Sequence, residues 1–182
     1  MLKKVIRSII YRFRGEYTTE KLMKMGMKVG KNFYRLNGVI LDPAHCWLIE
    51  IGDDVTLAPR VHILAHDAST VHYLGYAKIG KVVIGNKVFI GSDTVVLPNV
   101  CIGNNIVVGA NSTVTRDLES GYVYAGNPAR KICSIEEFVE KNRNLMRTVP
   151  CYNEEYTLRK NINVEKKKQM TEELSGSFGF VR

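Results

Sequence analysis

The side chains best suited to proton transfer in this chain are its four histidines, His45, His62, His66 and His72. The pKa of a free imidazole lies close to neutral pH, so a histidine can take a proton from a hydroxyl group and return it to a leaving group. His62 ends a six-residue repeat and is expected to face solvent, whereas His66 follows where that repeat is interrupted. His45 lies in an irregular stretch and is expected to be either structural or a substrate contact. General acid–base catalysis is therefore the first chemistry that these residues suggest.

A six-residue repeat from Ile84 to Glu119 must position these side chains. A period of six fits neither an α-helix nor a flat strand, so each step is a short extended piece followed by a fixed turn. Three steps make one coil of about eighteen residues, and stacked coils pair like neighbouring parallel strands. The repeat therefore predicts an all-β fold, a parallel β-helix. The positions expected to face inward are Ile84, Ile90, Val96, Ile102, Val108 and Val114, together with Val88, Thr94, Val100, Ile106, Ser112 and Leu118.

The repeat also occurs upstream, from Ile51 to Ile63, but the two runs are out of phase. The segment between them is polar and aromatic and has no repeat, which predicts an inserted loop over residues 65–83. Functional residues concentrate on loops that a rigid scaffold positions. His66 stands where the chain leaves the coil to enter this loop.

These patterns predict three zones. They are an N-terminal helical segment (1–26), the β-helix (27–132) and a C-terminal helical extension (133–182). The first zone carries a basic amphipathic pattern, which is expected to pack on a neighbouring coil or subunit, or else to lie on an anionic membrane surface. Thr18 is expected to cap a helix within it, and a charged helix is expected from Asn163 to Leu174.

Composition excludes several classes of protein. The chain of 182 residues has no apolar run long enough to cross a membrane, and its start lacks a cleavage pattern, so neither a membrane span nor secretion is expected. The net charge of +8 is spread over both ends without an aromatic and basic platform, which argues against nucleic acid. Such a charge also attracts anionic small molecules. The four cysteines have no metal-type spacing and are expected to be reduced thiols in a cytoplasmic protein.

Three stretches resemble the hexapeptide-repeat acetyltransferases, in particular the branch of maltose and galactoside O-acetyltransferases. They run from Val83 to Ser92, from Val108 to Asp117 and from Ala125 to Arg130. The resemblance implies a left-handed β-helix, acetyl-CoA as acetyl donor, no metal, and a homotrimer with active sites between subunits. Residues 152–159 look similar to acetyltransferases of capsule or lipopolysaccharide assembly, which implies a saccharide acceptor.

The resemblance also implies roles for single residues. His66 matches the catalytic histidine, which acts as general base. Asn37, Asp42 and Asp67 are candidate acceptor contacts, and Asp42 is also a candidate to orient the imidazole. Asp67 is poorly placed for that, because successive residues of an extended chain point to opposite sides. The residues expected to bind coenzyme A are Ser92, Ala110, Thr115, Arg116 and Arg130, of which Arg130 matches a phosphate-binding arginine.

Three alternatives stay open. An N-acetyltransferase acting on an amino sugar, an amino acid or an antibiotic would use the same donor. Carbonic anhydrases on this solenoid bind zinc through three histidines, and His62, His66 and His72 would supply them if one strand bent. A scaffold without catalytic activity is the third. Metal analysis and an assay of thiol release from acetyl-CoA separate these alternatives.

Overall fold

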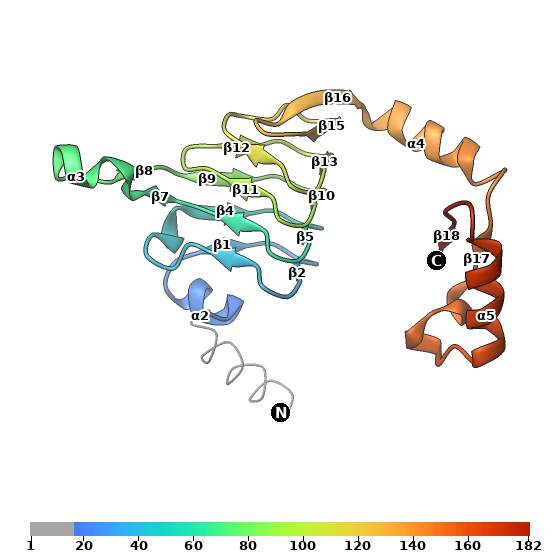
Figure 1. Ribbon diagram of the computed structural model, residues 1–182. Coiled ribbons are helices and arrows are strands. Elements are labelled where there is room, and N and C mark those ends of the chain that lie inside the picture. Colours follow the sequence, from blue (N-terminus) through green and yellow to red (C-terminus); the bar gives the residue numbers. More distant parts are fainter. Residues whose placement is uncertain (1–16) are drawn as a thin grey trace. The chain divides into compact units, whose positions relative to one another are not determined.

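The computed structural model describes residues 17–182, and the chain divides into two compact units between Ile135 and Glu136 (Figure 1). The amphipathic stripe expected in the N-terminal segment lies in residues 1–16, outside the described residues. Helix α2 (Thr19–Lys24) begins as predicted, because the side chain of Thr18 accepts a hydrogen bond from the backbone N–H of Lys21 at 3.2 Å. From residue 17 onward, none of the helices has the length and apolarity needed to span a membrane.

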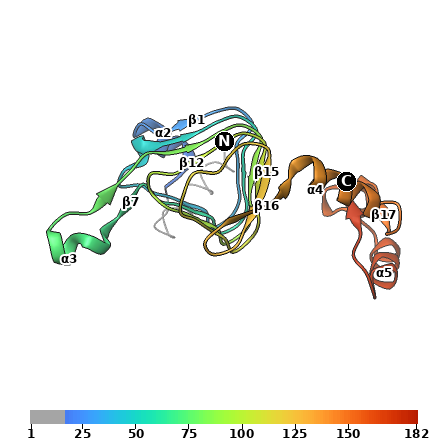
Figure 2. The ribbon, with the colours of Figure 1, turned by 90° about the horizontal axis from the view of Figure 1, so that it is seen from above.

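The first unit winds through three sheets in turn, and this winding is seen end-on in Figure 2. Their strands pair in parallel except for the last two of the second sheet, which pair antiparallel. Successive strands of the chain fall in the first, second and third sheet, so that the chain traces a three-sided parallel coil. The first sheet holds β1 (Lys28–Val29), β4 (Ile49–Ile51), β9 (Val82–Ile84) and β12 (Cys101–Ile102). The second holds β2 (Tyr34–Arg35), β5 (Thr56–Leu57), β10 (Val88–Ile90), β13 (Ile106–Val108), β15 (Tyr122–Ala125) and β16 (Arg130–Ser134). The third holds β3 (Ile40–Leu41), β6 (His62–Ile63), β11 (Val95–Val96) and β14 (Thr113–Val114).

The strand register follows the repeat of the sequence. Val88 pairs with Ile106 and Val95 with Thr113, which are about eighteen residues apart in each case. The twelve positions expected to face inward are all buried, and their exposed fractions are 4% or less. The parallel architecture predicted from the period of six is therefore confirmed.

At one corner of the coil, side chains form a ladder that joins successive coils. The carboxylate of Asp53 accepts from the backbone N–H of Lys31, and the side-chain oxygen of Asn86 accepts from that of Asp53. Asn104 accepts in the same way from Asn86, at 2.7 Å. The backbone N–H groups at this corner thus gain partners that the strands do not supply.

The inserted loop leaves the coil after Ala65 and projects away from it (Figure 1). Its two arms, β7 (His66–Asp67) and β8 (Lys78–Ile79), form an antiparallel pair in which His66 lies opposite Ile79. Between them stand the 3₁₀ turn η2 (Ala68–Thr70) and the short helix α3 (Val71–Leu74). The coil resumes with β9 at Val82, so the loop ends two positions earlier than the predicted range of 65–83.

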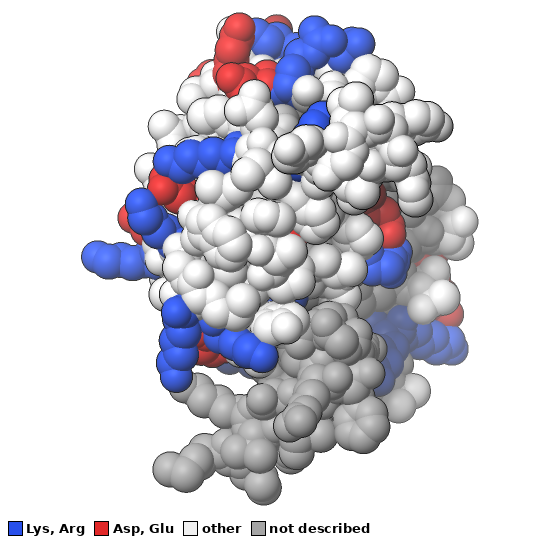
Figure 3. Space-filling view, turned by 90° about the vertical axis from the view of Figure 1, so that its left-hand side faces the viewer, with Lys and Arg blue, Asp and Glu red and all other residues white. Residues whose placement is uncertain are grey.

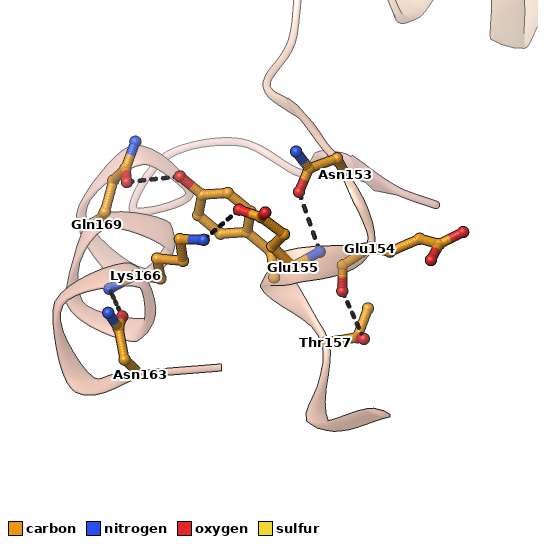
Figure 4. A network of polar contacts seen from close by, with 8 residues as sticks. Asn153, Glu154, Glu155, Thr157, Asn163, Lys166 and Gln169 are labelled. Carbon is orange, nitrogen blue, oxygen red and sulfur yellow. Dashed lines mark hydrogen bonds and ion pairs between the residues drawn. The ribbon is translucent and has the colours of Figure 1, made fainter. Parts of the chain in front are cut away.

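The second unit consists of short helices held together by polar contacts. After α4 (Ile135–Leu145), it contains β17 (Cys151–Tyr152), η3 (Glu154–Tyr156), η4 (Leu158–Lys160), α5 (Val164–Glu173) and β18 (Phe180–Val181). The charged helix expected from Asn163 to Leu174 is α5, and Asn163 caps it by accepting from the backbone N–H of Lys166 at 2.9 Å. Lys166 in turn pairs with Glu155 at 2.5 Å, which links η3 to α5 (Figure 4).

We expect Gly85→Ala to destabilise the coil. A Cβ at Gly85 would lie 2.5 Å from the side-chain oxygen of Asn104 and 2.7 Å from the carbonyl oxygen of Gly103, so two coils would have to separate. Overpacking of this kind costs about 1–3 kcal/mol in the free energy of unfolding. Urea unfolding followed by circular dichroism measures the loss. Gly176→Ala, where a Cβ meets nothing within 4 Å, is the control, and equal stability of the two variants would contradict the prediction.

We expect the second unit to lose stability at alkaline pH through Tyr152. Burial and a hydrogen bond to Glu173 raise the pKa of Tyr152 to about 12, because both disfavour the phenolate. The contribution is complete below the unfolded-state pKa of about 10, and it is lost as the pH rises toward 12. Denaturant unfolding between about pH 9 and about pH 11.5 should therefore show a smaller alkaline loss in Tyr152→Phe. Identical pH dependence in the two proteins would contradict this.

Candidate active site

Asp42 and His66 form a hydrogen-bonded pair beside the third sheet. Asp42 directly follows β3, and one of its oxygens, Oδ2, lies 2.5 Å from Nδ1 of His66. The exposed fraction of the Asp42 side chain is 1%, whereas that of His66 is 35%. A buried carboxylate therefore holds an imidazole whose ring is partly open to solvent.

The register of the third sheet brings these two residues together. Leu41 in β3 pairs with Ile63 in β6, and the backbone N–H of Asp42 donates to the carbonyl of Ile63 at 3.0 Å. The Asp42 carboxylate also accepts from the backbone N–H of Ala65 at 2.9 Å and of Ala44 at 3.0 Å. Asp42 is thus fixed to the coil above it at the point where the chain turns outward to His66.

The environment of Asp42 keeps its carboxyl group ionised. Burial by itself raises the pKa of this group, but the hydrogen bonds from His66, Ala65 and Ala44 outweigh burial, and the net pKa lies below the ordinary value. An ionised carboxylate facing Nδ1 favours the imidazole tautomer with the proton on that nitrogen. The other nitrogen, Nε2, then carries the lone pair with which His66 can accept a proton.

Asp67 makes different contacts from Asp42. Its carboxylate pairs with Lys78 at 2.7 Å and accepts from the backbone N–H of Ser69 at 2.8 Å. The ion pair with Lys78 and the hydrogen bond from Ser69 hold the pKa of Asp67 far below its ordinary range. Asp67 therefore fastens the two arms of the loop to each other.

Asn37 stands in the exposed turn between β2 and β3, and its carbonyl accepts from the backbone N–H of Arg60 at 3.1 Å. Within residues 17–182, no hydrogen bond joins Asn37 to Asp42 or His66. The structure thus brings together His66 and Asp42 of the predicted acceptor site, with Asp67 next to them, but does not link Asn37 to them.

The residues expected to bind coenzyme A lie along the later coils. Ser92 and Ala110 occupy equivalent positions in successive coils, since Gly91 packs against the backbone of Ala110. Thr115 and Arg116 are exposed just after β14. Ser92 and Ala110 thus stand at the corner after the second sheet, and Thr115 and Arg116 stand at the next corner, after the third sheet.

Arg130 and Lys131 differ in how their charges are used. Arg130, the first residue of β16, is exposed, and its guanidinium donates to the carbonyl of the adjacent Ala129 at 3.2 Å. Lys131 pairs with Glu119 at 2.6 Å and lies over the ring of Tyr122, 3.6 Å from its centroid. Of these two cations, Arg130 is the one whose charge is available to a ligand.

His45 is the residue at this site that sequence reasoning did not place. Its ring centroid lies 5.3 Å from that of His66 and also 5.3 Å from that of Trp47. His45 directly precedes the 3₁₀ turn η1 (Cys46–Leu48) and lies three residues after Asp42, outside the regular repeat. The turn η1 does not follow the six-residue repeat, so the repeat alone could not predict the contact between His45 and His66.

The three histidines of the zinc alternative, His62, His66 and His72, do not converge in the described part of the chain. The one group there whose ligand atoms all lie within 4.8 Å of one another is Asp42, His45 and His66. The geometry of the described residues therefore does not support the alternative of a zinc site formed by His62, His66 and His72. His72 stands exposed in α3, on the projecting loop.

Comparison with known proteins agrees with this geometry. Residues 81–116 match the family model described as bacterial transferase hexapeptide (six repeats). Protein CapG of Staphylococcus aureus is 34% identical over 171 residues, which cover 91% of this chain and 92% of CapG. Galactoside O-acetyltransferase of Escherichia coli is 39% identical, over 60% of this chain and 54% of that enzyme, so the chain spans about half of its length.

Two solved structures share the fold of the coil. The maltose O-acetyltransferase of Clostridium difficile superposes with a TM-score of 0.54 at 38% identity, over 60% of this chain and 59% of that chain. A hexapeptide-repeat acetyltransferase of Vibrio cholerae, solved with acetyl coenzyme A, superposes with a TM-score of 0.55 at 26% identity, over 60% and 61%. The coil is thus that of an acetyltransferase. The chain belongs to the hexapeptide-repeat acetyltransferase family.

Proposed function

We propose that this protein is a saccharide O-acetyltransferase that uses acetyl-CoA as donor and His66 as general base. The observation that carries the assignment is the hydrogen bond between the buried Asp42 carboxylate and Nδ1 of His66, which leaves Nε2 free to accept a proton. A hydroxyl is a weak nucleophile at neutral pH, so its attack on a thioester requires such a base. Similarity to a galactoside and a maltose O-acetyltransferase supports a saccharide as acceptor.

In the proposed reaction, Nε2 of His66 takes the proton of the acceptor hydroxyl while the hydroxyl oxygen bonds to the carbonyl carbon of the thioester. The carbon–sulfur bond then breaks, and His66 returns the proton to the coenzyme A sulfur. Asp42 stabilises the imidazolium that forms between these two steps, because its carboxylate already faces Nδ1. Backbone N–H groups of a neighbouring subunit would bind the developing oxyanion.

The donor would lie along the corner defined by Ser92 and Ala110, with Thr115 and Arg116 toward the nucleotide and Arg130 on a phosphate. Small residues at that corner let the pantetheine arm approach the backbone. A guanidinium matches the geometry of phosphate oxygens, which suits Arg130 to this role. Use of this donor supports a cytoplasmic location for the reaction, because coenzyme A thioesters are made in the cytoplasm. Residues 152–159 look similar to acetyltransferases of capsule or lipopolysaccharide assembly, and this similarity supports a precursor of one of these polymers as acceptor.

The proposed assembly is a homotrimer of left-handed coils, the winding and assembly that the family resemblance implies. The projecting loop supports it, because several of its apolar side chains are exposed, and clustered exposed apolar side chains mark interaction sites. Figure 3 shows that the face carrying the loop is largely uncharged, with charged side chains around its margin. The apolar side chains of the loop, with exposed fractions from 41% to 86%, are Val71, Tyr73, Leu74, Tyr76 and Ile79.

We expect His66→Ala to lower kcat by about 10²- to 10⁴-fold, the usual contribution of a general base. Asp42→Asn should approach the same loss, because its amide can donate to Nδ1 and so stabilise the tautomer that carries the proton on Nε2. Release of free thiol from acetyl-CoA, with maltose, galactosides and oligosaccharides as acceptors, measures the rate. His62→Gln is the control and should keep wild-type turnover. A folded His66→Ala enzyme with wild-type turnover would refute the assignment.

We expect Arg130→Ala to raise the KM for acetyl-CoA by about 10- to 100-fold, as the loss of charged hydrogen bonds implies, and to leave the KM for the acceptor nearly unchanged. Arg147→Ala, which removes one arginine from the end of the second unit's first helix, controls for the change in net charge. Steady-state kinetics with each substrate varied in turn gives both constants. A larger effect on the acceptor than on the donor would show that Arg130 does not contact coenzyme A.

A further inference from the structure

Asp42, His45 and His66 present three metal-ligand atoms to one another. One such atom from each residue lies within 4.8 Å of the other two. Asp42 is held by the backbone N–H groups of Ala44 and Ala65, so its position does not depend on His66 alone. The cluster is therefore formed by the first unit itself, at the junction between the coil and the loop.

His45 is the member of this cluster that has a ring nitrogen without a hydrogen-bond partner in the described residues. Its Nδ1 is buried and has no hydrogen-bond partner among residues 17–182. A buried nitrogen without a hydrogen-bond partner destabilises the folded protein, so a bound group that contacts this nitrogen is favoured. The neighbouring Cys46 does not contribute a ligand to this cluster. Its Sγ contacts the carbonyls of Leu22 and Met25, and burial raises the pKa of its thiol.

We propose that Asp42, His45 and His66 bind a divalent zinc ion, and that bound zinc blocks acetyl transfer. Two imidazoles and a carboxylate are the ligand types that zinc takes in sites with an open fourth position. Ligand atoms of tetrahedral zinc lie roughly 3.4 Å apart, so ligand atoms that are now farther apart need to close in by about 1.5 Å or less. If Nδ1 of His66 is the ligand, it must instead move away from Asp42, which is now 2.5 Å from it. Rotation of the His45 and His66 rings supplies a movement of that size.

Zinc would block acetyl transfer because it takes up the lone pair with which His66 accepts the proton. This inhibition rests on the proposed function. If zinc binds Nδ1 of His66, it displaces the proton shared with Asp42, and the proton moves to Nε2. If zinc binds Nε2, it occupies the basic nitrogen directly. Both modes leave His66 without a free lone pair for the acceptor proton, so zinc binding and general-base catalysis exclude each other.

The test measures metal binding separately from activity. Tag-free full-length protein is titrated with zinc by calorimetry and with cobalt(II), whose visible absorption reports coordination by nitrogen and oxygen ligands. We expect one zinc ion per chain. His45→Gln should weaken zinc binding at least about tenfold, since even outer-shell changes at metal sites cost 10- to 100-fold. His72→Gln, which changes an exposed histidine of the loop, should bind zinc as the wild type does.

Inhibition is then measured by thiol release, as the zinc concentration that halves each protein's own activity. We expect this concentration to rise with the dissociation constant in His45→Gln, and EDTA to restore the wild-type rate. Equal zinc affinity in the wild type and His45→Gln, or zinc bound without loss of activity, would overturn the proposal. Absence of any acetyltransferase activity would instead count against the proposed function, because the calorimetric and cobalt results stand without it.

Discussion

The register between successive coils is the constraint on which this structure depends. Parallel strands about eighteen residues apart lie in contact, and glycines such as Gly85 allow the turns to approach within a distance that a Cβ would prevent. Each coil is short and stable only against its neighbours, as in other repeat proteins. A substitution at one corner therefore affects the packing of the neighbouring coils. The position of each residue on a wall is fixed by that of its neighbour in the next coil.

The active site uses this register to hold a charge. Pairing of β3 with β6 puts Asp42 beneath the backbone of Ala65, where two N–H groups and one imidazole satisfy a carboxylate that is almost fully buried. Without these partners, burial would favour the neutral acid, and the acid would no longer fix the tautomer of His66. The scaffold thus keeps Asp42 ionised, and Asp42 favours the His66 tautomer that carries the proton on Nδ1. Only His66 extends toward solvent, where a substrate can reach it.

The sequence predicted the repetitive parts of the molecule well and the irregular parts poorly. Inward positions, the α2 cap at Thr18 and the start of α5 at Asn163 each follow from local patterns, and the structure confirms them. Asp42 could be named only as a candidate partner of His66, because that contact joins residues 24 apart across a phase break. The contact of His45 depends on the non-repetitive turn η1, for which periodicity gives no register.

A site of this composition can hold either a proton or a metal ion between the same groups. The buried carboxylate suits both, because it stays ionised and cannot move far from Ala44 and Ala65. What favours proton transfer is the short contact from Asp42 to His66, which any metal bound at Nδ1 must break. What favours a metal is Nδ1 of His45, which has no hydrogen-bond partner in the described part of the chain and which the proposed proton transfer leaves unused. The balance between the two therefore rests on His45, a residue that the acetyl-transfer mechanism does not require.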